Sequence, residues 1–213
     1  MTDPDELLEV YDPAGRPTGR AKARGLIHRD GDWHLAFFCW IVRQGPRGAE
    51  LVLQKRSANK DVWPGRFDAS AAGHVRFGET RAEVLREVDE ELGLVIAEQE
   101  LVALPRHRQE HRHANGIIDR EHHDLHLLRC DLPFEAYRPS ASEVSGLAAV
   151  PAVELADLSE RRRAGLDTEL VEFGLAGPVR RSALRLKAGD LVPYDDGYHR
   201  RLAERALAVV REG

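Results

Sequence analysis

The apolar positions near the start of the chain form short runs that predict strands. Residues 7–11 and 16–20 flank the turn sequence DPAG and predict a short opening hairpin. Residues 35–42 are almost all apolar and include several aromatic side chains. Because this run is shorter than the roughly 20 apolar residues of a membrane span, we expect a strand that is buried on both faces. GPRG then predicts a turn into another strand over residues 51–57.

A different spacing predicts an amphipathic helix that begins near residue 81. The apolar residues that can anchor this helix to a core are Val84, Leu85, Val88 and Leu92. Thr80 and Glu83 have the spacing of a capping box, and Gly93 suits the end of the helix. The helix is therefore expected to be well defined at both ends.

Strands and a second helical pattern follow. Residues 101–114 and 117–132 predict two strands around the turn ANG, and a strand then leads to a helix that begins near Pro151. Residues 159–193 have no regular pattern, whereas residues 198–213 carry apolar side chains at helical spacing. Three roles stay open for this terminal helix: covering the sheet, capping the site, or pairing with a second subunit in a homodimer.

Composition and charge favour a small-molecule partner. The chain has 213 residues, enough for one domain with a full core. Its formal charge of −5 and its pI near 6.1 give no reason to expect nucleic-acid or membrane binding. Cys39 and Cys130 lie in apolar segments and are expected to be free, buried thiols. The acidic N-terminus lacks the apolar stretch of a signal peptide, so we expect a cytoplasmic protein.

The candidate chemistry lies on the helix that begins near residue 81. Glu87 and Glu91 are four residues apart and share one face, and Glu90 lies about 60° around the helix from Glu87. Like charges at this spacing repel, and a hard divalent cation, Mg²⁺ or Mn²⁺, gives a reason to group them. Arg86 can pair with Glu90 and fix its orientation. A solvated acidic face is the plain alternative for the helix taken alone.

Basic residues lie ahead of this helix in the chain. Lys55, Arg56 and Lys60 are close to the loop over residues 59–68. Beside an acidic metal site, such side chains are suited to hold the oxygens of a diphosphate. Ordinary solvated charge explains any single one of them equally well.

Residues 73–94, GHVRFGETRAEVLREVDEELGL, resemble the Nudix box. The start of that pattern is matched by Gly73 and Glu79, and its end is matched by Arg86, Glu87, Val88, Glu90, Glu91, Gly93 and Leu94. Only six residues separate Glu79 from Arg86, where the family pattern has seven. The deletion precedes the helical turn that carries the glutamates, so it leaves their geometry intact and puts the role of Glu79 in question.

Residues 34–74 are also similar to isopentenyl-diphosphate isomerases and to isomerase-like Nudix hydrolases. Those isomerases bind a metal through histidines, and His28, His34 and His74 fall at or near the matching places. Each histidine taken singly is interpreted as structural or hydrogen-bonding. The isomerase cysteine that precedes Gly-His is replaced here by Ala72. This replacement removes the thiol expected to transfer protons and argues against isomerisation.

The strands after the box are rich in histidine. The residues concerned are His111, His113, Glu121, His122, His123 and His126. No cysteine or established zinc spacing accompanies them, and neighbours in a strand point to opposite faces, so we interpret them as strand edges rather than as a zinc site. Further on, Glu143 matches an acidic residue of the family, and it is either a metal ligand or base, or an ordinary loop carboxylate.

The resemblance implies an α/β (α+β) fold, an α/β/α sandwich of the Nudix type with a mixed sheet. A single domain over residues 1–213 is expected, with its core over about residues 8–158, an N-terminal hairpin, and a C-terminal helical extension over residues 159–213. The implied activity is metal-dependent hydrolysis of the diphosphate linkage in a nucleoside diphosphate derivative or another organic diphosphate. The rivals are an isomerase and a Nudix-fold ligand sensor without turnover.

Site residues are expected as follows. Mg²⁺ or Mn²⁺ is held by Glu87, Glu90 and Glu91; catalysis involves Arg86, Glu87, Glu91 and Glu143; the substrate contacts Lys55, Arg56, Lys60, Gly73 and His74. All three helix glutamates are present, which favours catalysis over sensing. The group attached to the diphosphate is left open, because specificity depends on loops and extensions.

Overall fold

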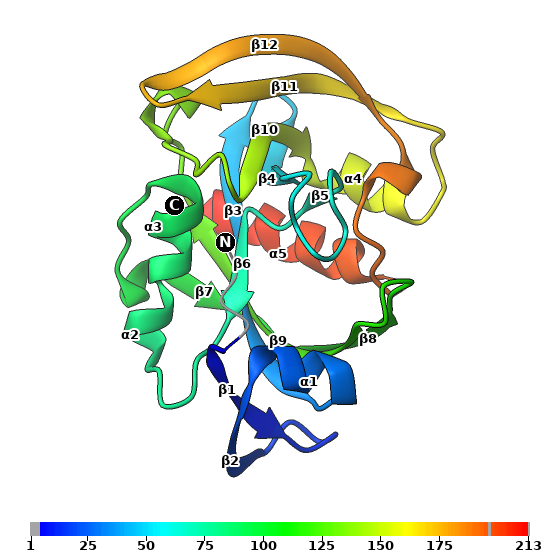
Figure 1. Cartoon of the computed structure of the whole chain (residues 1–213). Helices are drawn as coiled ribbons and strands as arrows, with labels where there is room; N and C mark the ends of the chain where they lie inside the picture. Colours follow the sequence, from blue (N-terminus) through cyan, green and yellow to red (C-terminus); the bar gives the residue numbers. More distant parts are fainter. Residues whose placement is uncertain (1–4, 196, 213) are drawn as a thin grey trace.

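The computed structural model, which describes residues 5–195 and 197–212, is built on one large mixed sheet (Figure 1). Its strands follow the order β12-β11-β10-β4-β3-β9-β7. In chain order these are β3 (His34–Gly45), β4 (Gly48–Arg56), β7 (Leu101–Ala103), β9 (Ile118–Arg129), β10 (Val144–Pro151), β11 (Leu166–Gly174) and β12 (Gly177–Leu186). Shorter strands add to it: β5 (Phe67–Asp68) on β4, β6 (Ala71–His74) on β3 and β8 (His107–Arg112) on β9.

Strand β3 is buried on both faces, as its apolar run predicts. Alternation sends Phe38 and Trp40 into one core and Phe37 and Ile41 into the other. Helices α4 (Ala152–Ser159) and α5 (Tyr198–Glu212) cover the first face, and α2 (Arg81–Val84) and α3 (Arg86–Leu92) cover the second (Figure 1). The predicted α/β/α sandwich with a mixed sheet is confirmed, since β3 pairs in parallel with β9 and antiparallel with β4.

The N-terminal hairpin is also present, as β1 (Leu7–Tyr11) and β2 (Pro17–Ala23). A short helix that the sequence did not predict, α1 (Arg24–Asp30), follows it and ends at Gly31 in the left-handed conformation. Backbone bridges from Leu8 to Arg76 and from Tyr11 to Trp33 bind the hairpin to the main body. This attachment places α1 beside strand β9 at one end of the sheet.

The glutamate helix forms in two pieces, α2 and α3, which meet at Leu85. Thr80 accepts a hydrogen bond from the Glu83 backbone, and the Glu83 carboxylate accepts one from the Thr80 backbone, so the predicted capping box is confirmed. Gly93 ends α3 with a φ of 67°, as expected for a left-handed C-cap. Gly73 and His74, however, belong to strand β6, and the turn of this region lies at residues 76–79.

The C-terminal segment is not simply helical, and this corrects the sequence prediction. Residues 166–186 form the long hairpin β11–β12, which crosses the top of the sheet in Figure 1. A brief 3₁₀ turn (Ala188–Asp190) then leads to α5. Because β12 is an edge strand and half of its residues are exposed, it lacks the apolar alternation that would have revealed it. Of the three roles left open for the terminal helix, α5 packs on the sheet and on α4.

The remaining short elements are 3₁₀ turns at Glu98–Glu100 and Phe134–Ala136. Within the described residues, no helix has the length and apolarity needed to cross a membrane. Both cysteines are free thiols, as predicted; Cys39 is buried as expected, whereas Cys130 is only half-buried.

Candidate functional site

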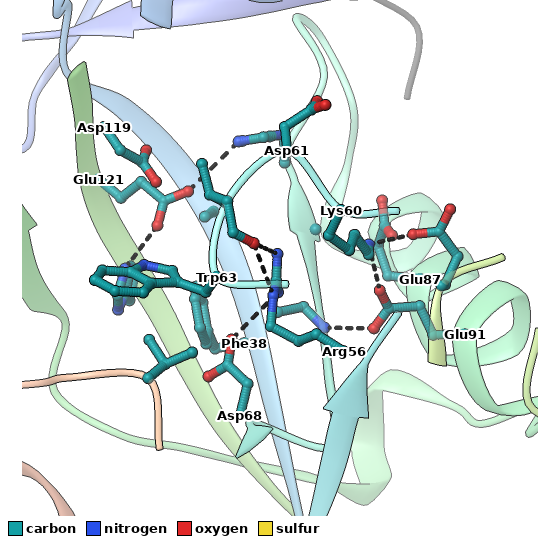
Figure 2. Close-up of a pocket in the computed structure, with 18 of the residues that line it drawn as sticks. Phe38, Arg56, Lys60, Asp61, Trp63, Asp68, Glu87, Glu91, Asp119 and Glu121 are labelled. Atoms are coloured by element: carbon teal, nitrogen blue, oxygen red, sulfur yellow. Dashed lines mark hydrogen bonds and ion pairs between the residues drawn. The ribbon is translucent and has the colours of Figure 1, made fainter. Parts of the chain in front are cut away.

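A single cavity of about 480 Å³ gathers most of the predicted site residues. Helix α3, strand β6, the loop that follows β4, and the hairpin β8–β9 all contribute to its lining. In Figure 2 the α3 glutamates lie on one side of the cavity, and Trp63, Asp119 and Glu121 lie across from them. The cavity therefore places two groups of acidic side chains opposite each other, with cations between them.

Two of the helix glutamates that line this cavity are withdrawn from solvent, Glu91 fully and Glu87 in part. Burial raises the pKa of Glu87 to about 7, an effect that Arg86 opposes and that the negative charge of Glu91 increases. Burial also raises the pKa of Glu91, against the opposing charge of Lys60. Glu91 accepts hydrogen bonds from Gln54 Nε2 and from the Ala72 backbone, each at 3.0 Å. The neighbouring carboxylates are thus fixed in position and carry a charge that favours a cation between them.

Gly73 is placed where a larger residue would disturb this arrangement. A Cβ atom at this position would overlap the carboxyl group of Glu87. Strand β6 can therefore approach helix α3 closely only because residue 73 has no side chain. Gly73 itself lies in strand β6, so its predicted contact with the substrate stays a prediction.

Arg86 binds three carboxylates at once. Its guanidinium group pairs with Glu79 at 2.8 Å, with Glu90 at 3.3 Å, and closely with Glu87. The predicted pair with Glu90 is present, but the buried contacts are to the other two glutamates, because Glu90 is mostly exposed. Arg86 thus orients Glu87, and Glu79 in turn holds Arg86.

Not all of the basic residues predicted to contact the substrate reach the cavity, and strand alternation explains which of them do. Arg56 and Lys60 line the cavity, whereas Lys55 is not among the lining residues. Successive residues of β4 point to opposite faces, so Arg56 and Lys55 cannot both reach the cavity. Lys60 bridges Glu91, at 3.3 Å, and Glu143. Burial tends to raise the pKa of Glu143, but the contact with Lys60 lowers it below its ordinary value.

Histidines and acids from the hairpin side form a second group. His28, His34 and His74 each offer a ring nitrogen, and these atoms lie within 4.8 Å of one another; His34, Asp119 and Glu121 form an overlapping group of the same size. His34 Nε2 and Asp119 Oδ1 are buried without a hydrogen-bond partner among the described residues. The separations of 3.6 Å from His34 to Glu121 and 3.8 Å from His34 to Asp119 are too long for hydrogen bonds.

The charges in this second group depend on each other. Burial lowers the pKa of His28 to about 2, and the neighbouring rings of His74 and His34 lower it further. Burial and the charge of Glu121 raise the pKa of Asp119 to about 7. Burial alone would raise the pKa of Glu121, but hydrogen bonding from histidines holds it well below its ordinary value. Burial tends to lower the pKa of His34, but the carboxylates of Glu121 and Asp119 raise it, whereas the pKa of His74 is lowered mainly by burial. Imidazoles beside carboxylates are a donor set suited to a divalent cation.

Sequence reasoning missed several residues of this cavity. Asp119, Glu121 and His123 point to the same side of β9 because they are two residues apart, and His122 lies on the other side against Trp33. That alternation was visible, but nothing in the sequence indicated which face meets the histidines. Arg24, from the unpredicted helix α1, also lines the cavity and donates to His74 at 3.3 Å.

The fold and the site together define a class of protein. A mixed sheet between helix layers presents a glutamate helix and several cations to one cavity, an arrangement suited to the chemistry of phosphate groups. The NUDIX domain family model matches residues 32–169, and the chain belongs to the Nudix hydrolase family. Members of this family generally use divalent metal ions, and membership is consistent with hydrolysis of a diphosphate linkage.

Particular relatives are similar over most of their length. An uncharacterised Nudix hydrolase of Clostridium acetobutylicum is 32% identical over 203 residues, which is 95% of this chain and 97% of that protein. An isopentenyl-diphosphate Delta-isomerase of Paenarthrobacter aurescens is 32% identical over 86% of this chain and 96% of its own.

Solved structures share the fold. The crystal structure of DR0079 from Deinococcus radiodurans has a TM-score of 0.54 at 19% identity and covers 80% of this chain and 95% of its own. The Nudix hydrolase RenU from M. smegmatis has a TM-score of 0.51 at 15% identity and covers 96% of each chain.

Proposed function

We propose that the protein is a metal-dependent hydrolase that cleaves the diphosphate linkage of a nucleoside diphosphate derivative or another organic diphosphate. The observation that carries this proposal is that one cavity holds the half-buried Glu87 and the buried Glu91 together with Arg24, Arg56 and Lys60. Carboxylates hold the cations that the reaction needs, and basic side chains neutralise the phosphate oxygens that would otherwise repel an attacking water.

The donor atoms present fit a divalent metal. Glu87, Glu90 and Glu91 provide the oxygen ligands that Mg²⁺ and Mn²⁺ prefer, and the raised pKa of Glu87 reflects buried negative charge that a cation would compensate. The histidine group, with the unpartnered atoms His34 Nε2 and Asp119 Oδ1, fits a second cation with nitrogen and oxygen ligands. A bound divalent cation lowers the pKa of water and neutralises phosphate charge.

The protein's own residues supply the rest of the reaction. Arg56 and Lys60 bind the diphosphate and orient it in the cavity. Glu87, Glu91 or Glu143 accepts the proton of the attacking water, since each lines the cavity and is partly or fully withdrawn from solvent. Arg86 holds Glu87 in position through a close ion pair.

An assay of defined substrates tests this function. The protein is incubated with nucleotides, sugar nucleotides, coenzyme A and prenyl diphosphates in the presence of Mg²⁺ or Mn²⁺, and released nucleotide, phosphate or pyrophosphate is measured. Turnover of at least one diphosphate, abolished by a chelator, is the expected result. A complete lack of turnover across the panel, with tight binding of one member, would favour a ligand sensor.

The histidine group and the similarity to the isomerase of Paenarthrobacter aurescens favour a second candidate, an isopentenyl-diphosphate isomerase. Moving a double bond requires proton delivery to one carbon and removal from another, and the methyl side chain of Ala72 can do neither. We therefore expect no interconversion of isopentenyl and dimethylallyl diphosphate. Chromatography after incubation with isopentenyl diphosphate and Mg²⁺ distinguishes the two activities. If dimethylallyl diphosphate is formed, the isomerase assignment replaces the hydrolase proposal.

A further inference from the structure

Residues 187–195, which follow β12, lie along the edge of the cavity. The Val192 backbone donates to the Phe67 carbonyl at 2.9 Å, and Leu191 forms a backbone bridge with the same residue. From the opposite side, Gln109 Nε2 donates to the Pro193 carbonyl at 2.6 Å. Strand β5 and strand β8 therefore hold this segment between them, although it lies well outside the residues matched by the family model.

Two side chains of this segment, Val192 and Tyr194, line the same cavity as the glutamates of α3. The Tyr194 ring is fixed, since it stacks on Tyr198 with ring centroids 4.1 Å apart and an interplanar angle of 10°. Phe38 and Trp63 also line the cavity. These four residues supply an apolar and aromatic surface. Such a surface does not suit a charged diphosphate, but it suits the organic group to which the diphosphate is attached.

Tyr194 is also connected to a phosphate-binding cation. Its hydroxyl donates a short hydrogen bond to Asp68 Oδ1, and Asp68 Oδ2 pairs with Arg56 Nη1 at 3.3 Å. Asp68 is only 4% exposed, and its Oδ1 also accepts a hydrogen bond from the Ala69 backbone at 2.8 Å. The Arg56 guanidinium group is further tied to the Val62 carbonyl by Nε and Nη2. The orientation of Arg56 thus depends in part on a carboxylate that Tyr194 helps to hold.

We propose, building on the proposed hydrolase function, that the C-terminal segment completes the substrate site. Tyr194 is a positioning residue that orients Arg56 toward the diphosphate through Asp68. Together with Val192, its ring forms the wall that determines which organic groups the cavity accepts. The two contributions are separable, because the hydroxyl acts on the diphosphate and the wall acts on the group attached to it.

Tyr194→Phe tests the positioning role, because it keeps the ring and removes only the hydroxyl. Loss of a hydrogen bond to a charged group is expected to weaken binding of inorganic pyrophosphate, measured by calorimetry, about tenfold. KM is expected to rise by a similar factor for every diphosphate turned over, with kcat changed less than KM. Tyr137→Phe is the matched control, since that buried hydroxyl contacts Cys130 Sγ at 3.7 Å and Tyr137 does not line the cavity.

Val192→Ala tests the wall. Enlarging the cavity at this point should change the ratio of kcat/KM for ADP to that for isopentenyl diphosphate by about fivefold or more in favour of the larger group. Binding of inorganic pyrophosphate, which has no organic group, should stay unchanged. The two variants therefore have opposite signatures, and thermal unfolding of both establishes that each is folded.

Three results overturn the inference. Unchanged pyrophosphate affinity in Tyr194→Phe would refute the positioning role. An unchanged ratio of kcat/KM values in Val192→Ala would refute the role of the wall in substrate selection. Absence of pyrophosphate binding by the unmodified protein would refute both roles. If the unmodified protein binds these compounds but hydrolyses none, the proposed hydrolase function fails by itself. Affinities for pyrophosphate, ADP and isopentenyl diphosphate then replace the kinetic constants in the same comparison.

Discussion

Glu87 is the residue on which metal binding should depend most. Its carboxylate is withdrawn from solvent, next to Glu91 and close to the backbone at Gly73. Replacing it with Gln keeps the shape of the side chain and removes the charge that a cation requires. Glu87→Gln should therefore weaken Mn²⁺ binding at least about tenfold in calorimetry and reduce turnover by a larger factor.

The control for this substitution is Glu204→Gln, which removes an exposed glutamate from α5, away from the cavity. Equal Mn²⁺ affinity in the Glu87 variant, its control and the unmodified protein would place the metal at another set of ligands.

A different result is expected for Glu79. Its carboxylate is nearly buried, but its contacts are to Arg86 and to the Arg76 backbone, and it is not among the residues that line the cavity. It acts on the site only by holding Arg86. Glu79→Gln should therefore reduce kcat less than Glu87→Gln does, by about tenfold or less, because the amide can still accept a hydrogen bond from Arg86. A loss as large as that of Glu87→Gln would assign Glu79 a direct role in the reaction.

At the scale of single residues, the sequence predicts site residues that lie within one helix and misses those that tertiary structure brings together. The spacing of Arg86, Glu87 and Glu91 determines their relative positions, since a helix has a fixed geometry. Asp119 and Glu121 meet His34 only because β9 pairs in parallel with β3, and no local pattern contains that pairing. For the same reason, an interpretation of each histidine by itself does not predict that the histidines lie together.

At the scale of elements, the capping box of Thr80 determines how well the glutamate helix is held. The four-residue helix α2 precedes α3 and is joined to it at Leu85, so fraying at Thr80 would spread toward Arg86. Thr80→Ala removes one capping interaction and should lower the free energy of unfolding by about 1 kcal/mol.

Urea unfolding measures this difference, and kcat measures whether the helix still positions its glutamates. Thr168→Ala serves as control, since the Thr168 hydroxyl also bonds to the backbone, here by donating to the Ala149 carbonyl, but lies in strand β11 and not in the glutamate helix. A stability equal to that of the unmodified protein would mean that tertiary contacts alone define the start of the helix.

Elements with a strong local signal were predicted, and those without one were not. The terminal helix and the strand around Trp40 have clear apolar periodicity. The sequence of the hairpin β11–β12 shows no regular apolar pattern, because half of the residues of β12 are exposed and three of these are arginines, so burial imposes little pattern on them. An edge strand is stabilised through its neighbour's backbone, which leaves little trace in side-chain hydrophobicity.

At the scale of the whole molecule, buried histidines make stability depend on pH. Burial lowers the pKa of His199 to about 3 and that of His107 to about 4, where His123 and Arg201 oppose protonation and Asp195 favours it. Both rings are neutral in the folded protein above these values, whereas the unfolded chain takes up protons below its ordinary histidine pKa of about 6.5. Stability is therefore fully present above about pH 6.5 and falls as the pH decreases toward 4.

Each of these histidines contributes a slope of up to about 1.4 kcal/mol per pH unit in that window. Urea unfolding at intervals between pH 7.5 and 4.5 should show the decline, and His199→Phe should make it shallower while changing little above pH 7. A slope identical in the variant and the unmodified protein would assign the acid sensitivity to other groups.

The predicted sandwich follows from one physical fact, namely that a strand apolar on both faces must be covered on both sides. That same strand has a consequence for how the chain is made. β3 leaves the ribosome long before its parallel partner β9 and before the helix α5, yet residues from both of its faces end in separate cores. Until synthesis reaches residue 129, β4 and β6 are the strands that can pair with it, and α2 and α3 can cover one of its faces. The face that α4 and α5 cover stays open through much of the synthesis, which makes early pairing with β4 and β6 a step that protects the nascent chain from aggregation.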